Sequence, residues 1–175
     1  DFFATREFRP AELRKSIPWL AKCRPMQAEP NTLTVSIRRG EAVKVSFFGG
    51  LSIGRVGQPE LTSDGTLLVA SLLDLAATKI AVIQQRSEKK DYMDLAALLQ
   101  HGVRLQDALS AACALYGQEL NPLISLKALT YFGDGDIHEL SSTIQQYLLR
   151  ASRGVTAIRG MRRRSKEIAP RLLPR

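Results

Sequence analysis

The hydrophobic pattern of this 175-residue chain changes its period once, near residues 66–70. Before that point, Thr32 to Arg38 and Ala42 to Phe48 alternate apolar and polar side chains, a pattern typical of half-buried strands. Arg39-Gly40-Glu41 supplies a turn between them, so a β-hairpin is predicted. A glycine-rich stretch follows, with room for one more short strand.

From residue 71 onward the apolar spacing is that of amphipathic helices. Helices are predicted at 71–86, 91–101, 104–116, 122–132 and 136–151, and a further short one from Pro10 to Leu20. Strands followed by helices predict an α+β fold, in which a small mixed sheet precedes a helical bundle. We expect three regions, at residues 1–68, 69–151 and 152–175, the last of which is a basic tail.

The formal charge of +8 is concentrated at the end of the chain. After Leu149 the sequence holds nine basic residues and one acidic residue, so residues 1–149 carry no net charge. A concentrated positive patch can hold a polyanion while a neutral body has another role. A solvated, frayed tail is the alternative that the sequence leaves open.

The composition is that of a soluble globular protein, and we expect a cytoplasmic location. No apolar run reaches the roughly 18 residues that a membrane-spanning helix needs, so no membrane partner is expected. Cys23 and Cys113 are far apart and lack metal-ligand spacing, which favours a reducing cytoplasm over a disulfide framework. The chain opens on Asp1-Phe2-Phe3 without an initiator methionine, and we expect it to be a piece of a longer protein.

Four charged residues fall on the expected inward stripes of two consecutive helices. At 100° per residue, Lys79 and Arg86 lie within about 20° of each other, on a largely apolar helix. Asp91 and Asp94 follow on the inward stripe of the next helix. Burying an unpaired charge costs on the order of several kcal/mol, so these side chains must form ion pairs with one another or share a ligand.

Two interpretations of this arrangement remain open. The first is a structural ion-pair network that fixes the packing of the two helices. The second is a pocket in which Lys79 and Arg86 hold phosphate oxygens, while Asp91 and Asp94 orient a metal, a base or the cations themselves.

The same segment resembles a family signature. Asp74-Leu-Ala-Ala-Thr-Lys79, then Arg86, then Lys89-Lys90-Asp91-Tyr-Met-Asp94-Leu95 occur in the order found in AbiEii/AbiGii-type nucleotidyltransferase toxins. The resemblance runs from about residue 31 to residue 132. It implies a polymerase-β-like nucleotidyltransferase sheet, here partial, followed by helices. It also implies that Lys79, Arg86 and Lys90 bind the nucleotide and that Asp91 and Asp94 belong to the catalytic site.

The resemblance further implies a magnesium site at the beginning of the chain. The family's first motif is a Gly-Gly or Gly-Ser turn followed by an Asp-x-Asp pair that holds Mg²⁺. Asp1 resembles the second aspartate of that pair, so the first is expected upstream and this polypeptide is expected to be inactive. Ser46 stands where related enzymes often carry a third, acid-base aspartate, and a hydroxyl does not take a proton at neutral pH. Either Asp91 or Asp94 supplies that function, or catalysis is weak.

The function implied by the resemblance is transfer of a nucleotide from an NTP to an acceptor such as tRNA. Such toxins are held in check by a cognate antitoxin protein. The basic tail suits an RNA acceptor, because phosphates attract clustered arginines. Two alternatives stay open: a non-catalytic interaction protein that keeps the scaffold, and an RNA-binding helical module for which NTP is irrelevant.

Overall fold

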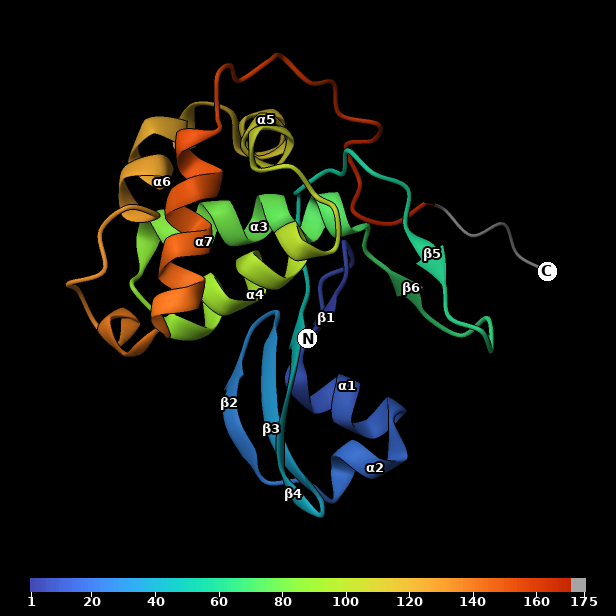
Figure 1. The fold of residues 1–175 in the computed structure, drawn as a ribbon. Helices are drawn as coiled ribbons and strands as arrows, with labels where there is room; N and C mark the ends of the chain where they lie inside the picture. The colour runs from blue at the N-terminus through green and yellow to red at the C-terminus, as the bar shows by residue number, and fades with distance from the viewer. Residues whose placement is uncertain (171–175) are drawn as a thin grey trace. The chain divides into compact units, whose positions relative to one another are not determined.

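The computed structural model describes residues 1–170, which fall into two compact units (Figure 1). One unit comprises Asp1–Ile53 with residues 166–170, and the other comprises Gly54–Ser165. The first contains a four-stranded sheet and the second is mostly helical. The predicted α+β class is therefore confirmed. Within residues 1–170, no helix has both the length and the apolar character needed to cross a membrane.

The sheet of the first unit has the strand order β1-β4-β3-β2. The strands are β1 (Phe2–Phe3), β2 (Pro25–Glu29), β3 (Thr32–Arg39) and β4 (Glu41–Phe48). β1 runs parallel to β4, and the other pairs are antiparallel. The predicted hairpin is confirmed as β3 and β4, which turn at Gly40. The φ of Gly40, +78°, lies in the left-handed region that favours glycine.

Two short helices pack on this sheet where one was predicted. They are α1 (Pro10–Ser16) and α2 (Pro18–Ala21), separated by Ile17 in an extended conformation. Pro18 has no amide hydrogen to donate and therefore starts a new helix rather than continuing the first. Leu20 of α2 forms a buried core with Leu33 and Val35 of β3.

The second unit begins with a hairpin and continues as helices. Its hairpin consists of β5 (Glu60–Leu61) and β6 (Leu68–Val69). The helices are α3 (Leu72–Gln85), α4 (Lys89–Gln100), α5 (Leu105–Tyr116), α6 (Pro122–Ala128) and α7 (Ser142–Arg153), with 3-10 turns η1 (Gly117–Glu119) and η2 (Ile137–Glu139). α3 packs against α4, α5 and α6 (Figure 1). Small buried side chains such as Ala76, Ala77 and Ala81 let these helices approach closely.

The last two helices are shorter than predicted. α6 ends at Ala128 rather than residue 132, and α7 begins at Ser142 rather than residue 136. The predicted first turn of α7 is instead the separate 3-10 turn η2. Ser141 caps α7, since its Oγ accepts the backbone N–H of Ile144 at 3.4 Å.

Candidate functional site

The beginning of α3 is fixed by a capping arrangement. The backbone N–H of Asp74 donates to Ser71 Oγ at 3.1 Å, and Ser71 Oγ donates to Asp74 Oδ2 at 2.8 Å. The same carboxylate accepts the backbone N–H groups of Val56 at 2.7 Å and Gly57 at 3.0 Å. A Cβ at Gly57 would lie 1.9 Å from Ser71 Oγ, so only glycine fits there. The loop before the hairpin is thus tied to the helix that carries Lys79.

The beginning of α4 is held by a loop far along the chain. The backbone N–H of Lys89 donates to Asp136 Oδ1 at 2.6 Å, and Lys89 Nζ pairs with Glu139 at 2.5 Å. Gly135 has a φ of +52°, and a Cβ on it would lie 2.2 Å from the carbonyl oxygen of Ser87. This loop therefore packs directly against the connection between α3 and α4.

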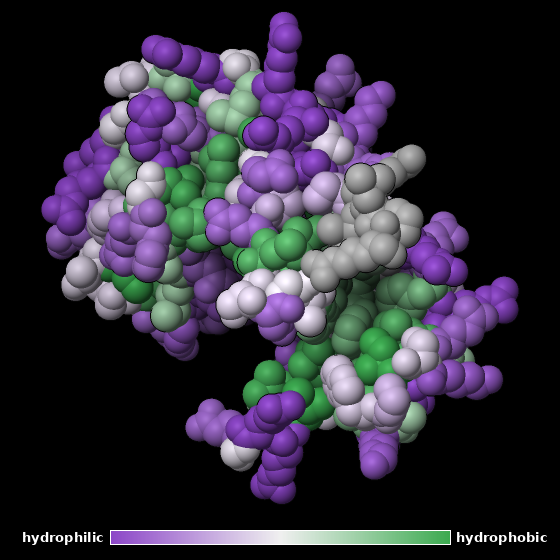
Figure 2. All heavy atoms as spheres, turned by 90° about the vertical axis from the view of Figure 1, so that its right-hand side faces the viewer, coloured by the Kyte–Doolittle hydropathy of each residue, from purple (hydrophilic) through white to green (hydrophobic). Residues whose placement is uncertain are grey.

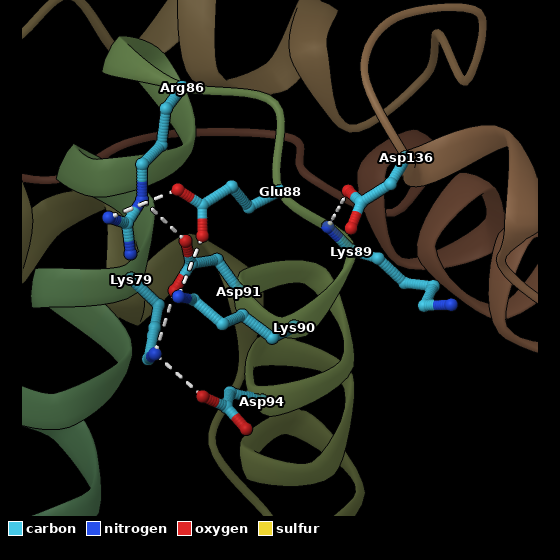
Figure 3. A network of polar contacts seen from close by, with 8 residues as sticks. All are labelled: Lys79, Arg86, Glu88, Lys89, Lys90, Asp91, Asp94 and Asp136. Atoms are coloured by element: carbon cyan, nitrogen blue, oxygen red, sulfur yellow. Dashed lines mark hydrogen bonds and ion pairs between the residues drawn. The ribbon is translucent and has the colours of Figure 1, made fainter. Parts of the chain in front are cut away.

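Asp91 joins the two helices through both of its carboxylate oxygens (Figure 3). Lys79 Nζ lies 2.9 Å from Asp91 Oδ1, and Arg86 Nε lies 2.9 Å from Asp91 Oδ2. The Asp91 side chain is only 1% exposed. The structure therefore brings together three of the residues that the sequence singled out, with one buried anion between two cations.

Glu88, Lys90 and Asp94 complete this group of charged residues, the Asp91 cluster, and lie at its exposed rim. Lys79 Nζ is 2.6 Å from Asp94 Oδ2, Arg86 Nη1 is 3.3 Å from Glu88, and Lys90 Nζ is 2.7 Å from Glu88. The Asp94 side chain is 55% exposed and that of Arg86 46%. The expectation that Asp94 and Arg86 face inward is therefore wrong. Asp94 is offset by about 60° from Asp91 around the helix, which carries it from the interface to the rim.

The charges of the cluster stabilise one another. Burial alone would lower the pKa of Lys79, but hydrogen bonds to Asp94 and Asp91 outweigh it and raise that pKa above its ordinary value. Burial would likewise raise the pKa of Asp91, yet hydrogen bonds from Arg86 and Lys79 hold it below its ordinary value. The hydrogen bond to Asp91 also raises the pKa of Arg86. All three groups are therefore charged at neutral pH.

The carboxylates that pair with Lys79 and Arg86 are of two kinds, one buried and the others exposed to solvent. Both oxygens of Asp91 are engaged and shielded from solvent, so it is poorly placed to accept a proton from a substrate. Asp94 and Glu88 neutralise Lys79 and Arg86 from the solvent side. Phosphate oxygens offer the same charge and the same acceptor geometry as these carboxylates. The cluster has the chemistry to exchange rim carboxylates for a phosphorylated ligand.

Asp1 lies in the other unit, beside Ser46. Phe2 pairs with Phe47 in the parallel register of β1 and β4, and their rings stack with centroids 4.9 Å apart. Because Asp1 precedes Phe2 and Ser46 precedes Phe47, the two occupy neighbouring positions, on the face opposite to these rings.

One carboxylate and one hydroxyl do not make the magnesium site that the resemblance implies. Among residues 1–170, no three histidine, cysteine, aspartate or glutamate side chains are placed to hold a metal ion together. The assignment of Asp1 as a metal ligand therefore stays a prediction.

Three contributing residues were missing from the sequence-based site. Glu88 bridges Arg86 and Lys90, Asp74 anchors the start of α3, and Asp136 caps α4. Ser-x-x-Asp at residues 71–74 is a helix-start pattern that the sequence does display. Asp136 carries no such signal, because it caps a helix that begins 47 residues earlier.

The chain is similar to known proteins over most of its length. An uncharacterized protein of Aquifex aeolicus (strain VF5) is 29% identical over 150 residues, which cover 84% of this chain and 70% of that protein. No solved structure matches the chain. The family model described as nucleotidyl transferase AbiEii toxin, type IV toxin–antitoxin system, matches residues 6–160, which include both helices of the cluster. The chain belongs to the AbiEii nucleotidyltransferase toxin family of type IV toxin–antitoxin systems.

Proposed function

We propose that the protein transfers a nucleotide from an NTP to an RNA acceptor such as tRNA, in the cytoplasm, and that a cognate antitoxin protein restrains it. Family membership supports the reaction class. The observation that carries the assignment of the nucleotide site is the cluster around Asp91. A buried carboxylate holds Lys79 and Arg86 in place, while their other partners are exposed.

Lys79 and Arg86 are the proposed contacts for the triphosphate. Exposed ion pairs contribute only about 0 to 1 kcal/mol, so exchanging Asp94 and Glu88 for phosphate oxygens costs little. A guanidinium fork matches phosphate geometry, and an ammonium group adds a compact point charge. Lys90, at the rim, adds a third positive charge when Glu88 turns away.

The proposed transfer forms one bond and breaks one. An acceptor hydroxyl oxygen bonds to the α-phosphorus, the bond from that phosphorus to the bridging β-oxygen breaks, and pyrophosphate leaves. The hydroxyl proton passes to a base. We assign that role to Asp94, which is accessible and becomes a free carboxylate once a phosphate takes Lys79 from it. Asp91 is a positioning residue in this scheme.

The direct test is incubation of the full-length gene product with α-labelled NTPs and total RNA. We expect labelled RNA with the unmodified protein and with the control Lys127→Ala, which removes an exposed lysine of α6. Lys79→Ala is expected to lower incorporation at least tenfold, because a charge-assisted contact contributes about 1.5 to 3 kcal/mol. Undiminished transfer by Lys79→Ala would remove this residue from the site. The magnesium requirement implied by the resemblance stays a prediction, which addition of EDTA tests.

Ser46 favours a second candidate, a non-catalytic interaction protein that keeps the scaffold. Its hydroxyl replaces an expected acid-base carboxylate and is buried in the sheet. This candidate predicts that the full-length protein transfers no label to RNA even when it binds NTP. Transfer by the unmodified protein would exclude it.

A further inference from the structure

We propose that residues 154–165, the arginine-rich segment, form a contact surface for the phosphate backbone of the acceptor RNA. The choice of RNA rests on the proposed function, whereas the surface itself rests on the geometry of the helical unit. Only residues up to 160 fall within the family match, so most of the arginines lie beyond it.

The arginine-rich segment has no regular secondary structure, yet it is attached along its length. The backbone N–H of Arg159 donates to Ser110 Oγ of α5 at 3.1 Å. Arg163 Nε donates to the carbonyl oxygen of Ala114, one helical turn further along α5. At its end, Arg55 and Ser165 form an antiparallel bridge with N···O distances of 3.0 and 3.3 Å. These contacts hold the segment against the helical unit.

The attached segment has two sides. Val155, Ile158 and Met161 recur every third residue and are half-buried. The arginines between and after them are exposed, namely Arg159, Arg162, Arg163 and Arg164. In Figure 2 hydrophilic side chains project from the top of the helical unit, at the height at which this segment runs in Figure 1. The segment therefore presents a concentrated positive surface.

Three of these arginines have unused guanidinium groups. Among residues 1–170, the side chains of Arg159, Arg162 and Arg164 form no ion pair or hydrogen bond. Arg163 differs, because its Nε is engaged with Ala114. Three exposed arginines within six residues of sequence concentrate positive charge, which a polyanion neutralises.

The chemistry of the surface favours nucleic acid over an acidic protein. Protein interfaces are centred on apolar or aromatic anchors, and no large apolar side chain of residues 154–165 is exposed. Guanidinium groups alone suffice to bind phosphates, which fix the position of a nucleic acid without reading its sequence. We therefore expect binding that depends on salt and tolerates many RNA sequences.

The test compares two triple variants of equal charge in a tRNA-binding titration. The first is Arg159→Gln, Arg162→Gln and Arg164→Gln, which keeps every backbone contact and the Arg163 anchor. The matched control is Arg38→Gln, Arg39→Gln and Lys127→Gln, three exposed cations outside the segment. Thermal unfolding checks that both variants remain folded. Titration with fluorescent NTP analogues measures nucleotide binding at the Asp91 cluster separately.

We expect the first variant to bind tRNA at least tenfold more weakly than the unmodified protein. The magnitude of its slope of log affinity against log salt should decrease by about 2 to 3, because each of the three lost phosphate contacts contributes about 0.7 to 0.9. The control should change affinity less than twofold. Equal losses in both variants, or no loss in the first, would overturn the proposal. Displacement of tRNA by polyglutamate at equal charge concentration would instead assign the surface to an acidic protein.

These outcomes are independent of the nucleotide site. Failure of NTP to bind, with arginine-dependent tRNA binding intact, contradicts the proposed function but not the contact surface. Normal NTP binding with unaffected tRNA binding contradicts the contact surface alone.

Discussion

Asp91 and Asp94 lie three residues apart on α4 and contact the same lysine, but solvent reaches them very differently. Asp91 is buried against two cations, and Asp94 is largely exposed with one. Asp91 accepts two hydrogen bonds from charged groups, and each such bond contributes about 1.5 to 3 kcal/mol. An exposed pair contributes about 1 kcal/mol or less. Two aspartates of one motif are therefore expected to differ in role.

We predict that Asp91→Asn lowers the free energy of unfolding by about 3 kcal/mol, because it weakens two hydrogen bonds to charged groups, and that it abolishes nucleotide transfer. The neutral amide no longer holds Lys79 and Arg86 at the interface. The matched control, Asp94→Asn, should keep stability within about 1 kcal/mol and retain NTP binding while transfer falls. Urea unfolding measures the stability of each variant, and titration with fluorescent NTP analogues measures nucleotide binding. Equal effects of the two substitutions on stability would contradict the distinction.

The charge of Asp91 makes the stability of the protein depend on pH. The pKa of Asp91 lies below its ordinary value of 3.8 in the folded protein, so its contribution is present above that pH and is lost as pH falls further. The raised pKa of Lys79 keeps its charge up to and beyond the ordinary value of 10.5. The stability difference between the unmodified protein and Asp91→Asn should therefore be constant near neutral pH and shrink below pH 3.8. A difference that persists unchanged in acid would argue against the buried charge.

At the scale of elements, the start of α4 depends on a residue from a distant loop. Asp136 accepts a hydrogen bond from the backbone N–H of Lys89. The N-cap residue of α4, Glu88, forms no capping hydrogen bond through its own side chain. We predict that Asp136→Ala costs about 1 kcal/mol, as loss of a helix cap does. Asp134→Ala, in the same loop, should leave stability unchanged. Chemical denaturation of the two variants decides this, and equal stabilities would show that Asp136 is dispensable.

The helices that carry the cluster were predictable because local pattern and tertiary environment agree there. α3 and α4 begin and end within two residues of their predicted bounds. β2 was missed because Pro25–Glu29 lacks the β-branched residues that mark strands, and its pairing with β3 decides its conformation. The start of α7 was placed too early because an apolar pattern continues through η2.

For the whole molecule, the sequence predicted the class of fold and the meeting of Lys79, Arg86 and Asp91. It did not predict contacts between residues far apart in the chain, such as that of Lys89 with Asp136 or of Arg55 with Ser165. Helical spacing gives the direction of a side chain around its own helix, but not which distant segment will lie against it. This is why the attachment of the arginine-rich segment was not foreseen.

The Asp91 cluster is proposed to bind a triphosphate rather than only to join two helices. Titration of the full-length protein and of Lys79→Ala with each fluorescent NTP analogue, alongside thermal unfolding, distinguishes these two roles. We predict saturable binding that weakens at least tenfold in Lys79→Ala, with the variant still folded at the temperature of the titration. Nucleotide binding that is unchanged in Lys79→Ala, together with a collapse of its thermal stability, would contradict the claim.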